Sequence, residues 1–492
     1  MVSAIVERVG RFKTGLARVA IDQTVNWAHR SPRFREWMLD RLADNLGKSY
    51  QDTARDQLLL AMQIWFGRSL RPFARRLIQE RPRAAQALVR LAYVWSRDVR
   101  RRTANAQQQA GVTPCTVVVE PTSRCNLNCP GCYAKSTSQG EDMSYEILRD
   151  TIAECRDMGA TLITLSGGEP FLRERQDRAI TRLAAEFPDL GFLTYTNGLL
   201  IDEAVARQLG EVGNVFPAIS VEGGEVESDR RRGSGYYRRT SAARRLLAAH
   251  EVMYGFSATV TRQNLDLVVS EKFIDERIAE GDLFGWYFLL QPIGRNPDVN
   301  LMVTAEQRAH MREQLYRFRA EGKPIFIGDF WNDGQFVAGC MAGGKYYFHI
   351  YANGDISPCV FSPVACGNMH DILAGRSEYT SLGDLVMRHP FFRGFREQQR
   401  KIHDWRAPCV LIDHPQLFRE LCQRYAGQWY PAKNMPEGYL DGEIAQALDE
   451  ISQAWQERLR SLPLIPDCVA RTLPAVPLGE DGAVAPCASR PR

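Results

Sequence analysis

From about Thr113 onward, short apolar runs rich in β-branched residues alternate with longer amphipathic stretches. Six of these runs have the length and composition of buried strands, and a stretch with helical spacing follows each of the first five. The six predicted strands cover residues 116–120, 161–165, 192–195, 216–221, 256–261 and 286–290. This alternation predicts an α/β fold in which a parallel sheet curls into a partial (β/α)6 TIM-like barrel. In such barrels reactive groups lie at the C-terminal ends of the strands.

The chain on either side of the alternating region has other patterns. Residues 1–112 carry apolar positions at helical spacing, clearest over residues 58–66, and predict a helical region. After Gly294 the alternation is expected to stop. Asn353-Gly354, the dipeptide typical of a two-residue hairpin turn, is flanked by apolar runs at 345–351 and 356–361. We therefore expect a helical region (1–112), the barrel (113–295), a small C-terminal module (296–425), and a helix with a Pro-rich flexible tail (426–492).

Composition narrows the classes of protein. With 45% hydrophobic and 24% charged residues, the chain is not a disordered, collagen-like or rod-shaped protein. It has neither an apolar run of about 18 residues, as a membrane span needs, nor an export signal, so we expect a cytoplasmic protein. Residues 1–110 contain 21 Lys and Arg against 9 Asp and Glu, although the whole chain carries only +4. This basic region fits a solvated helical face, another subunit, nucleic acid, or peripheral contact with the inner membrane surface. Its Arg-rich part, residues 68–102, is expected to form one or two helices packed on the main domain, with membrane contact as the alternative.

Three of the twelve cysteines, Cys125, Cys129 and Cys132, lie within eight residues directly after the first predicted strand. Disulfides are not expected in a cytoplasmic chain, so clustered cysteines indicate metal binding or catalysis. Spacings of four and three residues let three thiolates hold three corners of a cubane iron–sulfur cluster and leave the fourth iron open. The alternative is a zinc site, which would normally show two CxxC pairs or a nearby histidine. Neither occurs here.

This CxxxCxxC loop, followed by Tyr133, resembles that of the radical S-adenosylmethionine (SAM) enzymes. Further matches follow in the expected order over about residues 113–295, with weaker support to about 425. Gly167, Gly168, Glu169 and Pro170 match the GGEP motif, which implies binding of the SAM amino group. Asn197, Ser220 and Glu222 end the third and fourth strands, where the superfamily places groups near the SAM ribose and carboxylate.

Arg232 is the candidate partner of the SAM carboxylate. Four neighbouring arginines compete for that role: Arg230, Arg231, Arg238 and Arg239. Weaker candidates for the same pocket end the fifth strand, namely Thr259, Thr261 and Asn264.

The resemblance also implies a mechanism. SAM chelates the open iron of a [4Fe–4S] cluster, and an electron from the reduced cluster breaks the C5′–S bond. The resulting 5′-deoxyadenosyl radical removes a hydrogen atom from the substrate. The cofactors carry this chemistry while the protein positions them. A reducing partner such as flavodoxin or ferredoxin is implied, and no protein residue is assigned a catalytic role.

A second group of cysteines follows the barrel. Cys340, a hairpin and then Cys359 resemble the opening of the SPASM or twitch modules, which imply an auxiliary iron–sulfur cluster, and Cys409 would be the next ligand. The later CxxC of a full SPASM module is absent, so one auxiliary cluster is expected. Cys366, His414 and an open iron remain alternatives for the fourth position. The other five cysteines are expected to be inert thiols.

Four stretches, 216–222, 284–288, 329–334 and 339–344, are similar to those of a widespread, largely uncharacterised bacterial radical SAM family. A more distant resemblance is to archaeal enzymes that couple lipid tails. Two sets of residues could line a substrate cavity, one polar and aromatic and the other aromatic, although aromatic runs more often serve packing. They are Asp329, Trp331, Asn332 and Asp333, and Phe284, Trp286, Tyr287 and Phe288. His349 is expected to be structural.

The leading hypothesis is a radical SAM oxidoreductase or bond-forming enzyme with an unidentified substrate. The basic helices and aromatic strand suggest a hydrophobic or lipid-like substrate. The alternative is a peptide- or protein-modifying maturase, which should carry a peptide-recognition element near the N-terminus. A nucleic-acid-binding protein with a structural metal site is a third hypothesis. It would be favoured by alternating aromatic and basic residues on a sheet, which the sequence does not show, so we expect no nucleic acid partner.

Overall fold

The computed structural model describes residues 20–51, 70–92, 114–464 and 466. The helical run at 58–66, most of the Pro-rich tail, and Cys468 and Cys487 therefore lie outside the described residues. The main sheet has nine strands in the order β7-β6-β5-β4-β3-β2-β1-β8-β9. From β7 to β8 every neighbouring pair is parallel, and only β9 runs against its neighbour. This is the predicted partial barrel, and it is not closed.

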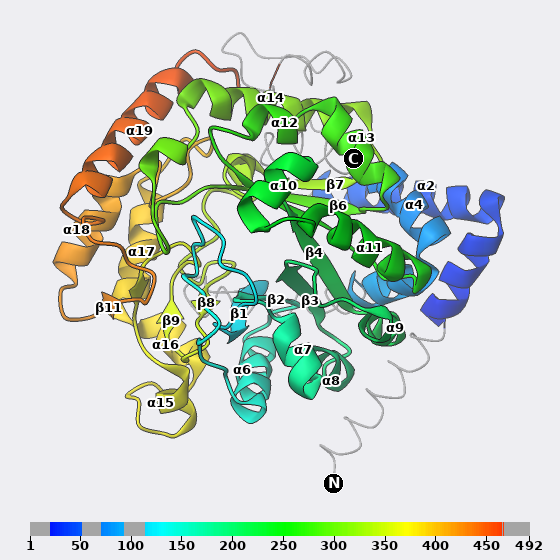
Figure 1. The fold of residues 1–492 in the computed structure, drawn as a ribbon, viewed down its shortest axis with the longest axis horizontal. Helices are drawn as coiled ribbons and strands as arrows, with labels where there is room; N and C mark the ends of the chain where they lie inside the picture. The colour runs from blue at the N-terminus through cyan, green and yellow to red at the C-terminus, as the bar shows by residue number, and fades with distance from the viewer. Residues whose placement is uncertain (1–19, 52–69, 93–113, 465, 467–492) are drawn as a thin grey trace, which may run out of the picture.

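The strands predicted from the apolar runs are all present. They are β1 (Thr116–Thr122), β2 (Leu162–Gly167), β3 (Gly191–Thr196), β4 (Val215–Val221), β5 (Gly255–Val260) and β6 (Phe284–Leu289). The helices that connect them cover the outside of the sheet (Figure 1). They are α6 (Tyr145–Asp157), α7 (Phe171–Asp177), α8 (Ala179–Glu186), α9 (Glu203–Val212), α10 (Glu225–Arg232), α11 (Tyr236–Ala249), α12 (Leu265–Val268) and α13 (Glu271–Ala279). Aliphatic and aromatic side chains between strands and helices form the main core.

The expectation that the alternation stops after Gly294 was wrong. After a short 3-10 turn (Val299–Leu301), α14 (Ala305–Glu321) leads into β7 (Phe326–Asp329), a seventh parallel strand on the outer edge of β6. The sequence concealed this unit because β7 has only four residues, and because α14 buries arginines at positions where a periodic pattern expects apolar residues. The predicted domain boundary at residue 295 remains a prediction.

The N-terminal helices close the bottom of the barrel. Helix α2 (Pro32–Gln51) lies against α4 (Arg71–Glu80), which buries Phe73, Leu77 and Ile78. Those side chains pack on residues at the N-terminal ends of the strands: Leu193, Phe216, Met253, Leu283 and Phe284. The apolar face of α4 is therefore buried against the barrel.

The predicted hairpin is formed by β8 (His349–Ile350) and β9 (Ile356–Ser357), with Gly354 at φ +85° in the turn. β8 adds to the main sheet beside β1, so the C-terminal module continues the barrel sheet. Five helices then pack along one flank (Figure 1). They are α15 (Met369–Leu373), α16 (Leu382–Arg388), α17 (Pro390–Arg400), α18 (Pro415–Arg424) and α19 (Glu443–Leu459). A separate pair, β10 (Val364–Ala365) and β11 (Tyr430–Pro431), completes the module.

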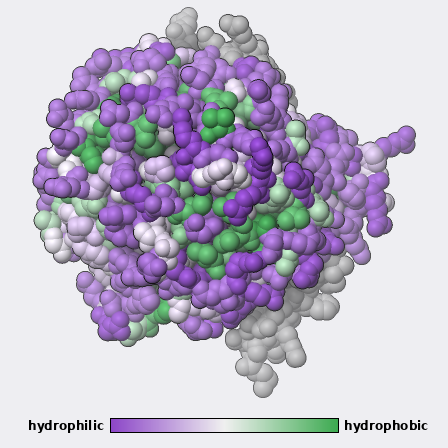
Figure 2. Space-filling model, in the orientation of Figure 1, coloured by the Kyte–Doolittle hydropathy of each residue, from purple (hydrophilic) through white to green (hydrophobic). Residues whose placement is uncertain are grey.

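The face seen in Figure 2 is mostly hydrophilic, with hydrophobic residues gathered near its middle, where Figure 1 labels β2 to β4. Among the described residues, no helix combines the length and hydropathy of a membrane span.

Candidate functional site

A cavity of about 420 Å³ extends from the barrel interior to the C-terminal ends of the strands. Cys125, Cys129 and Cys132, on the loop that follows β1, all line it. Within the described ranges, no three His, Cys, Asp or Glu side chains surround a single metal ion position. The three thiols instead lie on the wall of a common space.

The cysteine loop is held by arginines that sequence reasoning did not single out for this purpose. Arg295 donates to the carbonyl of Cys129 at 3.0 Å and to that of Ser136. Arg231 reaches the carbonyls of Pro130 and Gly131, both at 3.3 Å. No sequence spacing indicates these contacts, because Arg231 and Arg295 lie about 100 and 166 residues further along the chain.

The GGEP segment joins the cysteine loop through the backbone. The Gly168 amide donates to the carbonyl of Thr122 at 2.9 Å, and the Glu169 amide donates to that of Arg124 at 2.8 Å. Gly167 has φ +98°, and a Cβ on Gly168 would lie 1.9 Å from the Arg124 carbonyl oxygen. Both glycines are therefore required for this close approach. Gly167, Gly168 and Glu169 line the cavity, whereas Pro170 lies outside the lining and caps α7.

Glu169 is buried, and three donors orient it. Its Oε1 accepts from the Thr196 hydroxyl at 2.6 Å and from the Phe171 amide at 3.1 Å, and its Oε2 accepts from the Asn197 amide at 2.7 Å. Burial nevertheless raises the pKa of this carboxyl to about 7. A cationic group in the cavity would favour the carboxylate form, so Glu169 is suited to receive an ammonium.

Tyr133, Asn197 and Ser220 also line the cavity. The hydroxyls of Tyr133 and Ser166 are 2.5 Å apart, and Asn197 Nδ2 donates to Oδ1 of Asn126 at 2.8 Å while lying 4.0 Å from the Cys125 sulfur. These contacts tie the ends of β2 and β3 to the cysteine loop. The structure thus brings most of the predicted SAM-site residues to one edge of the sheet.

Glu222 does not line the cavity, although Arg231 and Arg232 do. It is buried and pairs with Nη1 of Arg231 at 2.7 Å and with Nη2 of Arg232 at 2.6 Å. Of the competing arginines, Arg238 pairs with Glu225 on the surface. Arg232 and its competitor Arg231 therefore both lie at the cavity, so the role of Arg232 toward SAM stays a prediction.

The three weaker candidates at the end of the fifth strand do not all lie at the cavity. Thr259 lines the cavity, whereas Thr261 and Asn264 do not. Asn264 accepts from the amide and hydroxyl of Thr261, at 2.7 and 3.0 Å, and donates to the carbonyl of Glu222 at 3.0 Å. These two residues form a local turn.

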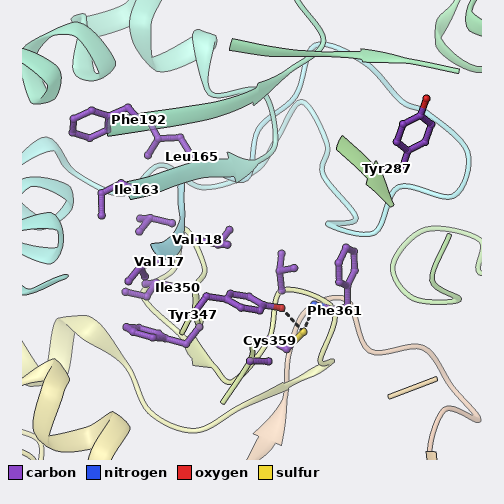
Figure 3. Packing of buried hydrophobic residues seen from close by; sticks show 14 of the residues in the cluster. Val117, Val118, Ile163, Leu165, Phe192, Tyr287, Tyr347, Ile350, Cys359 and Phe361 are labelled. Atoms are coloured by element: carbon purple, nitrogen blue, oxygen red, sulfur yellow. Dashed lines mark hydrogen bonds between the residues drawn. The ribbon is translucent and has the colours of Figure 1, made fainter. Parts of the chain in front are cut away.

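The second set of cysteines faces the same cavity. Cys340, Cys359 and Cys409 all line it, and the phenolic oxygen of Tyr347 lies 2.7 Å from the Cys359 sulfur (Figure 3). Burial raises the pKa of Cys125 and of Cys359 to about 12. Iron binding at either set must therefore displace protons from the thiols.

The two candidates for a fourth auxiliary ligand lie elsewhere. Cys366 is buried outside the cavity lining, and burial followed by the nearby Cys422 thiol raises its pKa. His414, at the start of α18, has Nε2 3.0 Å from the carbonyl of Ala407 and is not part of the lining. A ligand role for either residue remains a prediction that this geometry does not support.

Aromatic rings line the cavity between the two cysteine sets. Phe288, Phe330, Trp331 and Phe361 pack on one another with ring centroids 5.0–6.4 Å apart. Trp286 belongs to the same lining, whereas Tyr287 points to the other face of β6 and donates to the Val268 carbonyl. Phe284 also lies outside the lining and packs with the N-terminal helices.

Two acidic side chains also belong to the cavity lining. Asp329 and Asp333 line the cavity, while Asn332 is buried beside them and donates to Asp329 at 2.8 Å. Burial, together with the nearby Asp333, raises the pKa of Asp329 to about 6. His349, predicted to be structural, is buried with its Nε2 3.2 Å from Oε1 of Glu120, away from the cavity.

The residues present fit the cofactors implied by the sequence. Three thiols on one loop, an adjoining backbone cradle that tolerates no Cβ, a buried carboxylate and a cavity-lining arginine suit an iron–sulfur cluster with an amino-acid-bearing ligand. Three further thiols on the same cavity suit a second cluster.

Comparison with known proteins agrees with this fit. Residues 119–266 match the family model described as the radical SAM superfamily. The chain is 30% identical over 304 residues to mycofactocin maturase MftC of Mycolicibacterium smegmatis, an alignment covering 58% of this chain and 73% of that protein. It is 28% identical over 320 residues to an AdoMet-dependent heme synthase of Oleidesulfovibrio alaskensis (58% and 78% covered), and 27% identical over 265 residues to a PqqA peptide cyclase of Rhizobium meliloti (50% and 67% covered). With these relatives and this cysteine geometry, the chain belongs to the radical SAM superfamily and carries a SPASM-like module behind its barrel.

Proposed function

We propose that this radical SAM enzyme modifies a peptide, one side chain of which enters the cavity between the two cysteine sets. The enzyme uses a [4Fe–4S] cluster and SAM. The observation that carries the proposal is that six cysteines, from two segments more than 200 residues apart, line a single cavity with aromatic walls. A side chain of a peptide is small enough to enter such a cavity while the peptide backbone stays at its mouth.

Each part of the lining has a proposed task. Cys125, Cys129 and Cys132 hold the SAM-binding cluster, and Cys340, Cys359 and Cys409 hold the auxiliary cluster. Glu169 accepts hydrogen bonds from the SAM ammonium, and Arg232 pairs with its carboxylate. When bound, the cluster and SAM supply one-electron cleavage of the sulfonium and thereby abstraction of a substrate hydrogen atom.

The aromatic residues exclude water and orient the substrate. Phe288, Phe330 and Trp331 give the cavity an apolar wall, which keeps stray hydrogen donors away from the reacting carbon. The backbone around the GGEP segment and the cysteine loop is fixed by its own hydrogen bonds, so the cofactor site is formed in advance. An electron donor such as flavodoxin or ferredoxin is part of the proposal.

A lipid-like substrate finds little support. The apolar side chains of α4 pack against the barrel, and its Arg76 donates to the carbonyls of Ile278 and Asp282 at 2.7 and 2.8 Å. These contacts account for the amphipathic pattern of residues 71–80 without a membrane. The relative named PqqA peptide cyclase favours a peptide.

A tetrapyrrole is the second candidate, because two relatives are named as AdoMet-dependent heme synthases and a third as an Fe-coproporphyrin III synthase. The porphyrins on which heme synthesis depends carry carboxylate groups, and these groups need cationic partners in a binding site. Among the described residues that line the cavity, the cationic side chains are those of Arg231 and Arg232. Arg231 holds carbonyls of the cysteine loop and Arg232 is assigned to the SAM carboxylate, so neither is left for the substrate. The charge of the cavity therefore favours a peptide over a tetrapyrrole.

Deuterium transfer can test the substrate class. The anaerobically reconstituted enzyme would be incubated with SAM, dithionite and one of three pools: perdeuterated small peptides, perdeuterated lipids, or deuterated iron coproporphyrin. Mass spectrometry of the released 5′-deoxyadenosine then reports which pool gave up a hydrogen atom. We expect deuterium from the peptide pool alone.

The control is the Cys125→Ala/Cys129→Ala/Cys132→Ala variant, which should release no 5′-deoxyadenosine from SAM. Deuterium from the lipid or porphyrin pool, or from none of the three, would contradict a peptide substrate.

A further inference from the structure

The auxiliary cysteine set has a hydroxyl group directly on one of its sulfurs. The phenolic oxygen of Tyr347 lies 2.7 Å from Sγ of Cys359, and the backbone amide of Phe361 donates to the same sulfur at 3.4 Å (Figure 3). A cysteine that binds iron does so as a thiolate, which has no proton to give. In the loaded enzyme Tyr347 must therefore be the donor of this contact.

The surroundings keep Tyr347 in place. Its side chain is buried just before β8, and its ring packs on that of Phe330 with centroids 5.9 Å apart. A tyrosine hydroxyl ordinarily loses its proton only near about pH 10, so at neutral pH it has a hydrogen to donate.

We propose that the Tyr347 hydroxyl donates a hydrogen bond to the Cys359 thiolate of the auxiliary cluster and raises the reduction potential of that cluster. The proposal rests on the proposed role of Cys340, Cys359 and Cys409 as cluster ligands. An added electron makes the cluster sulfurs more negative, so a donor stabilises the reduced state more than the oxidised state. Reduction takes one electron from an external reductant, and the phenol proton stays on Tyr347.

Tyr347→Phe removes this donor while keeping the packed ring. The matched control is Tyr439→Phe, because Tyr439 is also buried and its pKa is raised by burial and by its nearness to Cys409 and Cys359. Within the described part of the chain, the Tyr439 hydroxyl makes no hydrogen bond to a sulfur. Both changes would be made in the Cys125→Ala/Cys129→Ala/Cys132→Ala background, so that the auxiliary cluster is the one measured.

Each protein would be reconstituted anaerobically and titrated with dithionite while electron paramagnetic resonance follows the reduced cluster. We expect Tyr347→Phe to make reduction about tenfold less favourable, which is about 59 mV toward negative potential for a one-electron couple. Tyr439→Phe should leave the potential unchanged. Electron–nuclear double resonance in D₂O should also show an exchangeable proton near the cluster that Tyr347→Phe removes.

An unchanged potential and an unchanged exchangeable proton in Tyr347→Phe would overturn the proposal. Loss of the cluster from Tyr347→Phe, shown by counting iron and sulfide, would also overturn it, since the residue would then act as a ligand or in assembly. A triple-cysteine background that binds no iron would remove the auxiliary cluster and this hydrogen bond together. If Tyr347→Phe shifted the potential but the enzyme took no deuterium from peptides, this inference would stand and the peptide substrate would be rejected.

Discussion

At the scale of single residues, Glu222 shows how a buried group that does not face the cavity can shape it. Burial alone would raise the pKa of its carboxyl, but Arg231 and Arg232 reverse the effect and hold that pKa below its ordinary value. The carboxylate fixes Arg232 at the cavity and Arg231 on the carbonyls of the cysteine loop. One charge therefore connects the proposed carboxylate site of SAM to the loop that holds the cluster.

We expect Glu222→Gln to weaken SAM binding about tenfold, or about 1.4 kcal/mol, since a hydrogen bond to a charged group contributes roughly 1.5–3 kcal/mol. Isothermal titration of SAM into the anaerobically reconstituted protein would measure this change. Iron must be counted first, to show that the cluster is loaded equally.

The control is Glu225→Gln at the start of α10, the helix that carries Arg231 and Arg232, because its partner Arg238 is exposed. That change should leave SAM affinity as it is. Equal affinity in Glu222→Gln and the wild type would show that the two arginines do not need this charge.

At the scale of secondary-structure elements, helix α4 followed the leading interpretation of its sequence, whereas helix α14 departed from its pattern. Helix α4 has an amphipathic, Arg-rich sequence, and its apolar side chains pack on the barrel as expected. Helix α14 has a polar sequence, yet it buries Arg308, Arg312 and Arg319. Carboxylates satisfy two of these arginines, because Arg308 pairs with Asp413 and Arg319 with Asp333 at 2.7 Å.

Helix α4 should contribute measurably to the stability of the barrel. Leu77 is buried against the strand ends, so Leu77→Ala should lower the free energy of unfolding by roughly 2–5 kcal/mol. A shift of the urea midpoint, followed by tryptophan fluorescence, would measure the loss.

Val89→Ala is the matched change, since the Val89 side chain lies in the same N-terminal region but is exposed. This substitution should lower the free energy of unfolding only slightly. If Leu77→Ala unfolded at the same urea concentration as Val89→Ala, the packing of α4 on the barrel would be in doubt.

At the scale of the whole molecule, Lys433 and Asn434 connect the C-terminal module to the barrel. Lys433 Nζ lies 2.8 Å from Oε2 of Glu120, the buried carboxylate on β1 behind Gly167. The next residue, Asn434, donates to the carbonyl of Tyr133 at 3.2 Å and accepts from Tyr351 at 3.1 Å. The C-terminal module is thereby bonded to the strand and loop that carry the first cysteine set.

This ion pair predicts a pH dependence of stability. Burial opposes the charge on Glu120, but Lys433 and then His349 outweigh it and lower the pKa from 4.5 to about 2. The ionised group therefore stabilises the fold fully above pH 4.5, by up to about 3 kcal/mol, and loses this contribution as the pH falls through about 2. Lys433→Met should be less stable than the wild type at pH 7, and the difference should shrink as the pH falls below 4.5.

Urea midpoints between pH 7 and pH 3 would test this dependence, with Lys401→Met, at an exposed lysine, as the control. A difference between Lys433→Met and the wild type that stayed constant with pH would show that packing, rather than the charge on Glu120, is responsible.

The sequence by itself determined whatever depends on neighbouring residues. Three cysteines within eight residues must share one loop, and Gly167 and Gly168 allow a close approach that no other residue tolerates. Alternating apolar runs and amphipathic stretches were enough to predict six parallel strands and the edge at which these loops meet.

Only the tertiary structure decided which distant residues meet. It brought Cys340, Cys359 and Cys409 to the cavity of the first set, left Cys366 beside Cys422, and turned Glu222 toward two arginines. It also added β7, whose four residues acquire strand geometry by pairing with β6. Such contacts depend on strand register and on side-chain packing, and a shift of one residue would turn every side chain of a strand to the opposite face. The local sequence pattern does not determine which distant residues these contacts bring together.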